Sequence, residues 1–140
     1  MHQKSFSTLL RYDEKILGIT VPLIVQNGEL FTEILDAKID TGSTYCVFSR
    51  EYADVLGIGD VESGEEIRVE SPIGGTATIF GHQLRLTVAG VSVDSLAYFW
   101  EDRGKTRNVL GRVGWLQKFR ICIVDHDCEF YFSGYNDPED

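Results

Sequence analysis

Short apolar runs separated by turn residues make up most of this chain, and they constrain its fold more than any other feature. The segment QLRLTVAGVSVDSLAYFW shows the pattern most clearly. Leu84 and Leu86 alternate with polar residues, and the alternation resumes at Val91 after the turn residues Ala89 and Gly90. Successive side chains of a strand point to opposite faces, so this pattern predicts two strands joined by a tight turn.

A second strand pair is predicted from residues 16–25 and 30–40, which flank the turn signal QNGE. The return strand places apolar side chains on one face at a period of two, with Glu33 as the exception. These apolar residues are Phe31, Leu35, Ala37 and Ile39. The pair therefore ends on a charged residue, Asp40.

Two further hairpins are predicted nearer the C-terminus. IRVESPIGGTATIFG indicates two strands that meet at a tip containing Pro72, Ile73, Gly74 and Gly75. Two adjacent glycines remove the steric restriction on the backbone, which is typical of a mobile hairpin. The last hairpin turns at about residues 125–127.

Helical signals are few. Ser49 can cap a short helix in which Ala53 and Leu56 share one face, and Gly57 can end it. A second short helix is predicted over residues 115–119. The chain contains 14 glycines and only 3 prolines, which favours many turns over long helices. The fold class is therefore all-β with one or two short helices.

The length of 140 residues, 43% of them hydrophobic, suits one domain with its own core. We find no repeat or linker, so we expect a single domain over residues 1–140, with a core at about 16–132 and flexible ends. The net charge of −9 argues against nucleic acid and anionic membranes as partners.

Targeting signals are also missing from the sequence. The apolar run at residues 19–25 is too short to span a bilayer, and MHQKSFSTLL lacks the apolar core of a signal peptide. The three cysteines are too few for a disulfide scaffold. We therefore expect a cytoplasmic protein with reduced thiols.

The stretch AKIDTGSTYCVFS places an aspartate and small polar residues between two apolar runs. A buried carboxylate without a partner costs free energy, so Asp40 must be solvated, paired or used. Thr41 and Ser43 can donate hydrogen bonds, and Gly42 lets main-chain amides approach the carboxylate. The stretch fits a positioned carboxylate and equally an ordinary Asx turn.

The chain resembles the retropepsin-like, or retroviral-type, aspartic proteases in three landmarks that occur in the order of that family. They are AKIDTGS at the end of a strand, SPIGGTA at the place of the flap, and NVLGRVGWLQKF before the C-terminal helix. The resemblance spans about residues 16–132. It implies a single-domain acid-protease β-barrel and the activity of an aspartic endopeptidase.

The resemblance also implies a role for each matched residue. Asp40 would be the catalytic aspartate, and Thr41 would link the two active-site loops. Gly42 would contact the substrate backbone, while Ser43 would donate to the aspartate and favour activity in acid. Three residues would form the flap tip, and three others would pack behind the active-site loop as its support. They are Ile73, Gly74 and Gly75 at the flap, and Leu110, Gly111 and Arg112 at the support.

The mechanism of the family needs two carboxylates that share a proton and activate a water. This chain has one Asp-Thr-Gly-Ser motif, since Asp94, Asp125 and Asp127 lack these neighbours. The resemblance therefore implies a homodimer that acts on a peptide or protein substrate, without a metal or cofactor. Thr44 and Tyr45 stand where retroviral enzymes carry acidic residues, so Arg112 lacks its usual local carboxylate.

Two other interpretations stay open. The chain can be a retropepsin-like dimerisation or peptide-binding module with weak or no catalysis. It can also be a small β-barrel that binds an apolar ligand, with Asp-Thr-Gly-Ser as an ordinary turn. We interpret Cys122, His126 and Cys128 as an acidic turn flanked by thiols rather than a metal site, because their spacing matches no ordinary zinc pattern. We interpret Cys46 as a packed thiol.

Overall fold

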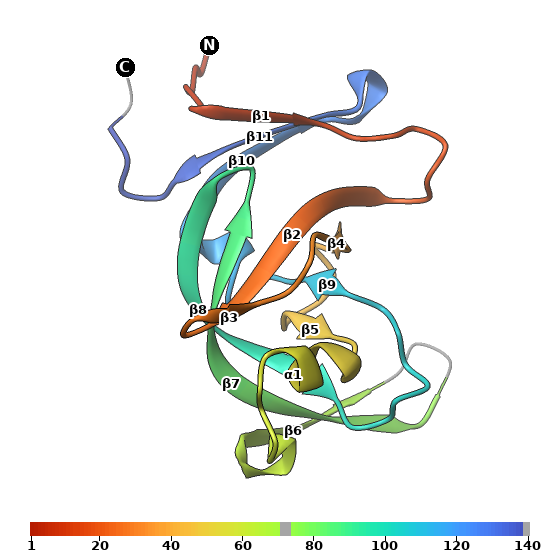
Figure 1. Ribbon diagram of the computed structural model, residues 1–140. Coiled ribbons are helices and arrows are strands. Elements are labelled where there is room, and N and C mark those ends of the chain that lie inside the picture. The colour runs from red at the N-terminus through yellow and green to blue at the C-terminus, as the bar shows by residue number, and fades with distance from the viewer. Residues whose placement is uncertain (71–73, 139–140) are drawn as a thin grey trace.

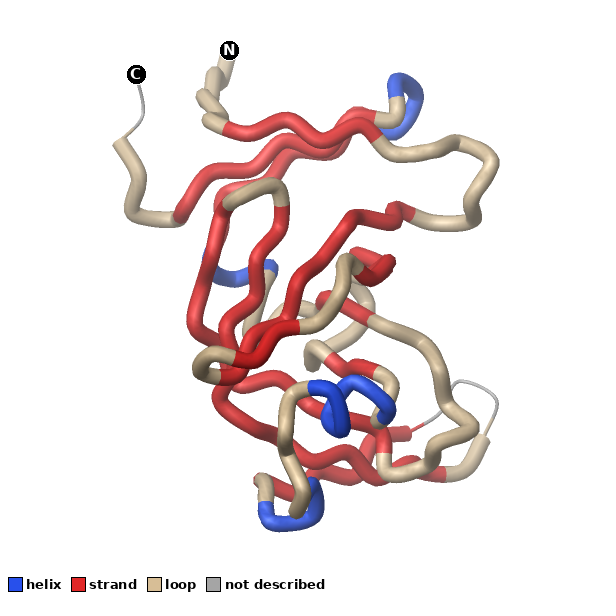
Figure 2. Tube along the Cα trace, viewed as in Figure 1, coloured by secondary structure: helices blue, strands red, loops and turns tan. Residues whose placement is uncertain are grey.

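The structure is a computed structural model that describes residues 1–70 and 74–138, and strands dominate it (Figures 1 and 2). The described residues contain one α-helix, α1 (Glu51–Val55). None of their helices combines the length and the apolar character needed to cross a membrane. The predicted all-β, single-domain fold is confirmed.

The larger sheet has eight strands in the order β3-β2-β4-β9-β5-β8-β7-β6. An additional pairing of β2 with β7 joins strands that are distant in this order and curls the sheet into a barrel (Figure 1). In chain order, the strands are β2 (Ile19–Asn27), β3 (Leu30–Phe31), β4 (Leu35–Ile39), β5 (Val47–Phe48), β6 (Glu65–Glu70), β7 (Thr76–Val88), β8 (Val91–Trp100) and β9 (Val109–Leu110).

The smaller sheet brings the two ends of the chain together above the barrel (Figure 1). It consists of β1 (Thr8–Arg11), β11 (Glu129–Gly134) and β10 (Phe119–Val124), in that order and all antiparallel. We expected the residues before 16 to be a flexible end, but β1 pairs with β11 from Thr8↔Phe132 onwards. The four residues of β1 are too few to show a clear alternation, and their pairing partner lies at the other end of the sequence.

An aromatic cluster connects the barrel to the smaller sheet. The Trp115 side chain is fully buried, and its ring centroid lies 4.8 Å from that of Phe119 and 5.7 Å from that of Phe132. Phe130 stacks on the same indole at 6.1 Å. Aromatic rings contribute large buried areas, so this cluster fixes the end of the chain to the core.

Three short 3₁₀ helices complete the structure: η1 (Val61–Ser63), η2 (Leu116–Lys118) and η3 (Asp125–Asp127). The helix predicted over residues 115–119 is thus the single turn η2. Ala53 of α1 and the C-cap residue Leu56 are buried, and Gly57 follows with a φ of +71°. Ser49 does not cap this helix, because the N-cap position is Arg50 and no side chain bonds there.

One apolar residue of the predicted return strand also lies elsewhere than expected. Phe31 is 65% exposed, whereas Leu35, Ala37 and Ile39 are buried. The expected strand is broken into β3 and β4. The period of two therefore does not carry across the break.

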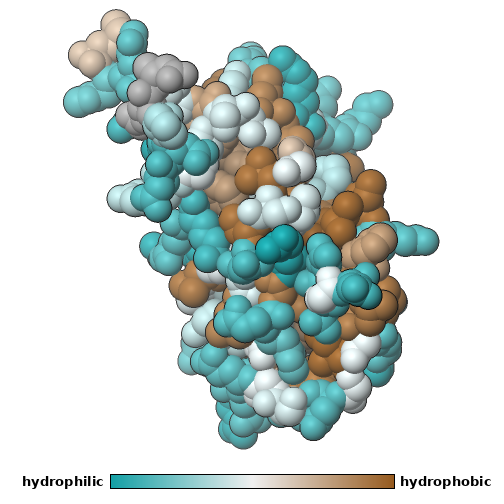
Figure 3. All heavy atoms as spheres, turned by 60° about the vertical axis from the view of Figure 1, so that its left-hand side comes forward, coloured by the Kyte–Doolittle hydropathy of each residue, from teal (hydrophilic) through white to brown (hydrophobic). Residues whose placement is uncertain are grey.

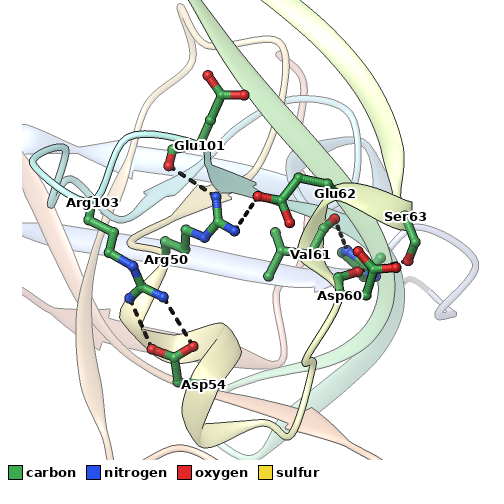
Figure 4. A network of polar contacts seen from close by, with 9 residues as sticks. Arg50, Asp54, Asp60, Val61, Glu62, Ser63, Glu101 and Arg103 are labelled. Carbon is green, nitrogen blue, oxygen red and sulfur yellow. Dashed lines mark hydrogen bonds and ion pairs between the residues drawn. The ribbon is translucent and has the colours of Figure 1, made fainter.

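A network of charged side chains holds α1 and η1 against the loop after β8 (Figure 4). Arg50 pairs with Glu62 and donates to the carbonyl of Glu101 at 3.1 Å. Arg103 makes two hydrogen bonds to the Asp54 carboxylate, at 3.0 and 3.4 Å. These hydrogen bonds lower the pKa of both Glu62 and Asp54.

Candidate active site

β4 and β9 together position Asp40. The alternate residues of β4 are buried, so the strand is anchored in the core up to Ile39. Ile39 lies opposite Leu110 in the parallel pairing of β4 with β9, and the Asp40 N–H donates to Leu110 O at 3.0 Å. The main chain of Asp40 is therefore fixed, while its side chain remains 32% exposed.

The residues after Asp40 form a tight turn around its carboxylate. The Gly42 N–H donates to Asp40 Oδ1 at 2.9 Å, and the Ser43 N–H donates to Asp40 O at 3.1 Å. A main-chain donor cannot rotate away, so it fixes the orientation of the carboxylate. The stretch is thus an Asx turn that also positions an acid.

The hydroxyl of Ser43 has a different partner from the one we expected. Ser43 Oγ donates to Tyr45 O at 2.9 Å, and the hydrogen bond to the Asp40 carboxylate comes from Gly42 instead. The hydroxyl therefore stabilises the second half of the loop. Thr41 is exposed, beside a hollow of about 200 Å³ that Arg112, Leu116, Gln117 and Ile121 also line.

The segment Leu110-Gly111-Arg112 lies directly behind this loop. The Arg112 N–H donates to Ser43 O at 2.9 Å, and the Val113 N–H donates to Thr44 O at 2.7 Å. A Cβ on Gly111 would lie 2.3 Å from Tyr45 O, so only glycine permits this approach. The Arg112 side chain itself is exposed.

Cys46 also belongs to this support. Its thiol is fully buried and accepts a hydrogen bond from the Gly111 N–H at 3.4 Å. Burial raises the pKa of Cys46 to about 11, although the Gly111 contact opposes this shift. Cys46 is therefore a packed thiol, as predicted, and not a nucleophile.

A groove of about 440 Å³ opens beside the Asp40 carboxylate. Its walls come from the active-site loop, from β6 and from the segment around β9. The lining residues are Asp40, Gly42, Ser43, Thr44, Tyr45, Val47, Val69, Glu70, Trp100, Arg107 and Val109. The groove thus joins the Asp40 carboxylate, and two further charged side chains, to the apolar surface of Val47, Val69, Trp100 and Val109, as a site for a peptide requires.

The hairpin of β6 and β7 stands beside this groove. Val69 and Glu70 at the end of β6 line it, and their strand pairs with β7 up to Glu70↔Thr76. Gly74 and Gly75 have φ angles of +97° and +79°, which favour glycine. Ile73, predicted at the flap tip, lies outside the described residues.

Arg107 is a residue of the groove that the sequence did not predict. Its Nη2 atom lies 3.7 Å from Asp40 Oδ2, on the side of the carboxylate that Gly42 leaves open. Arg107 directly precedes the NVLGR landmark, but no pattern in the sequence indicates that it approaches Asp40. Trp100 also lines the groove, and it donates from Nε1 to Arg107 O at 2.9 Å.

The other candidate aspartates have partners elsewhere. Asp94 Oδ1 lies 3.0 Å from Arg85 Nε, beside a separate hollow between β2, β7 and β8. Asp125 accepts a hydrogen bond from the Tyr12 hydroxyl at 2.5 Å. Neither lines the groove of Asp40.

Comparison with known proteins identifies the fold. No family profile matches this chain, and no curated protein matches it. A solved structure that does match is the retroviral protease-like domain of Ddi1 from Leishmania major. The likeness has a TM-score of 0.55 at 18% identity, and it covers 88% of this chain and 99% of the other. The chain therefore has the retropepsin-like fold.

Proposed function

We propose that this protein is an aspartic endopeptidase that acts as a homodimer. The observation that carries the proposal is the placement of Asp40. The main-chain N–H of Asp40 donates to Leu110 O, and its carboxylate accepts from the Gly42 N–H at Oδ1. The carboxylate lies at the wall of a 440 Å³ groove, beside a hairpin that contains Gly74 and Gly75. Such an arrangement suits a peptide held in an extended form next to an acid.

The proposed chemistry uses Asp40 from each of two subunits. One carboxylate takes a proton from a water while the water oxygen bonds to the scissile carbonyl carbon. The other, protonated, carboxyl group donates its proton to the carbonyl oxygen. The tetrahedral intermediate then collapses and the C–N bond breaks: the leaving nitrogen takes the proton held by the first carboxyl group, and a hydroxyl of the intermediate returns a proton to the second carboxylate. No metal or organic cofactor takes part in this scheme.

The exposed position of Thr41 supports the dimer. Thr41 and Arg112 line an open hollow next to Asp40, so the groups around the carboxylate are accessible to a second copy. One face of the molecule also carries uncovered hydrophobic surface between hydrophilic side chains (Figure 3). A single Asp40 in each chain makes the site incomplete without the partner.

The edge of β10 offers a surface for this contact. β10 is the last strand of the smaller sheet among the described residues, and Ile121 of β10 lines the same hollow as Thr41. Tyr135 N–H donates to Lys118 O at 2.9 Å, just beyond the β10–β11 register. In an antiparallel pair of strands, residues that exchange main-chain hydrogen bonds alternate with residues that do not. Since Lys118 bonds to its partner Tyr135, the main-chain groups of Ile121 and Ile123 point away from β11. An edge of this kind can pair with a second copy.

The test is a digest of a peptide library, with the Asp40→Asn variant as control. We expect cleavage by the wild type, inhibition by pepstatin, and a loss of at least about 10²–10⁴-fold in the variant. Sedimentation measures the dimer in the same samples. A wild type that stays monomeric at every concentration and pH, and that cleaves nothing, contradicts the proposal.

A peptide-binding module without catalysis is the second candidate, and the contact between Arg107 and Asp40 favours it. The guanidinium lies 3.7 Å from Oδ2, an oxygen that the proposed catalysis uses. A dimer that binds library peptides without cleaving them supports this alternative. The expected cytoplasmic location and the expected lack of nucleic-acid or membrane partners stay predictions.

A further inference from the structure

A short basic segment enters the groove of an acidic protein. The sequence RGKTR, residues 103–107, carries three cations in a chain of net charge −9. Arg103 points to α1, where it pairs with Asp54 at 3.0 Å. Arg107 instead lines the groove of Asp40, and Lys105 and Arg107 together line a neighbouring hollow. The groove of Asp40 thus carries Asp40 and Glu70 against one cation, whereas the neighbouring hollow carries two cations against Glu70 alone.

Arg107 is placed so that it can bind a ligand. It lines the groove and also a second hollow of about 320 Å³, which we call the side hollow. The Trp100 indole holds its main chain, but its side chain is 62% exposed. At 3.7 Å its contact with Asp40 is an ion pair rather than a hydrogen bond. The guanidinium N–H groups thus remain available to another acceptor.

The side hollow has both apolar and basic lining residues. Val69, Ala77 and Trp100 supply the apolar surface. Lys105 and Arg107 supply two positive charges against one negative charge from Glu70. Lys105 Nζ lies 5.7 Å from the centre of the Trp100 ring, which lines the same hollow. The complete lining is Val69, Glu70, Ala77, Trp100, Gly104, Lys105, Thr106 and Arg107.

We propose that the substrates are peptides with an aspartate or glutamate side chain next to the scissile bond, and that Arg107 selects this residue with help from Lys105. The inference rests on the proposed function, since it assigns the substrate class of the same site. Arginine binds a carboxylate through two parallel hydrogen bonds, a geometry that an amide or an amine does not reproduce. A lysine or arginine in the substrate would meet the like charge of Lys105 and Arg107.

The test compares matched peptides that carry Glu, Gln or Lys at each position near the cleaved bond. The assay runs at about pH 6, where a glutamate side chain is ionised. For the wild type, kcat/KM should be about 10- to 100-fold higher for Glu than for Gln at one position. Arg107→Gln should remove most of this preference, and Arg107→Glu should turn it towards Lys. Lys105→Gln should reduce it by a smaller factor.

Arg103→Gln is the matched control. It removes one positive charge from the same segment, but Arg103 pairs with Asp54 and lines neither hollow. The Glu preference should survive in this variant. Thermal unfolding of each variant verifies that the fold is intact. A Glu-to-Gln ratio within twofold in the wild type, or a ratio that Arg107→Gln leaves unchanged, overturns the inference while the protease proposal stands.

A binding experiment separates the two proposals if no peptide is cleaved. Peptides with a reduced amide at the central bond cannot be hydrolysed, and their Kd for the wild type and Arg107→Gln is measured by fluorescence polarisation. If the wild type binds the Glu peptide more tightly than the Gln peptide and Arg107→Gln does not, the assigned ligand class is supported. Only the proposal of catalysis is then wrong. Equal Kd values for Glu and Gln peptides reject the ligand class as well.

Discussion

At the scale of the residue, the carboxylate of Asp40 is oriented by the main chain and not by its serine neighbour. The Gly42 N–H reaches Oδ1, while the Ser43 hydroxyl reaches Tyr45 O. Substitutions at Ser43 therefore act on the loop, whereas the orientation of the acid depends on the backbone of the turn.

The Ser43→Ala variant tests whether the Ser43 hydroxyl stabilises the loop without affecting the Asp40 carboxylate. Loss of the hydrogen bond to Tyr45 O should lower the free energy of unfolding by about 0.5–1.5 kcal/mol, which urea denaturation measures. The pH–rate profile of cleavage should stay in place, because the donor to the carboxylate is unchanged. A profile that moves would show that the Ser43 hydroxyl turns to Asp40 in the active dimer.

At the scale of the element, the active-site loop fits closely against the segment of residues 110–113. Three main-chain hydrogen bonds join them: those to Leu110 O, Ser43 O and Thr44 O. The fit also requires a position without a side chain, which Gly111 supplies. The loop is thus shaped by a segment far from it in the sequence.

Gly111→Ala should disrupt this fit. The new Cβ would lie 2.3 Å from Tyr45 O, and both chains are held by hydrogen bonds, so the cost should be about 1–3 kcal/mol or more. Gly59→Ala is the control, since nothing lies within 4 Å of a Cβ there. Chemical denaturation of both variants measures the difference. Equal stability of the two variants would mean that the loop moves away without cost.

The charged network at α1 should make the stability of the protein depend on pH. Hydrogen bonds from Arg103, followed by its charge, lower the pKa of Asp54. A carboxylate with a lowered pKa stabilises the fold above its unfolded pKa of about 4, and this contribution is lost as the pH falls through the folded value. Arg103→Gln should therefore lower the unfolding midpoint slightly at pH 7 and not at about pH 2.5. A difference that persists in acid would point to packing by the arginine rather than to its charge.

At the scale of the whole molecule, the proposed dimer depends on the outer edge of β10. Ile123→Pro removes a main-chain N–H that points away from β11, so the smaller sheet should survive while pairing with a second copy is blocked. Ile123→Thr keeps the N–H and serves as the control. Sedimentation should find a dimer for Ile123→Thr and a monomer for Ile123→Pro. If both variants dimerise like the wild type, the contact lies elsewhere.

The sequence predicts the parts of this molecule that depend on local patterns. The hairpin at Ala89-Gly90, the turn η2 and the placement of Asp40 after β4 all follow from alternation and turn residues. The pairing of β1 with β11 and the approach of Arg107 to Asp40 do not, because each joins segments that only the folded barrel brings together. The pattern of apolar residues contains no information about such contacts until the topology is known.

The pairing of β1 with β11 also has a consequence for biosynthesis. Thr8 lies opposite Phe132, so β1 finds its partner only after all the residues between the two strands have been synthesised. Pairings of such long sequence separation slow folding, since the loop must close before the contact gains any free energy. Until then β1 is an open edge that a chaperone or another nascent chain can occupy. Translation speed and chaperone supply should therefore influence the yield of this protein more than its thermodynamic stability alone would suggest.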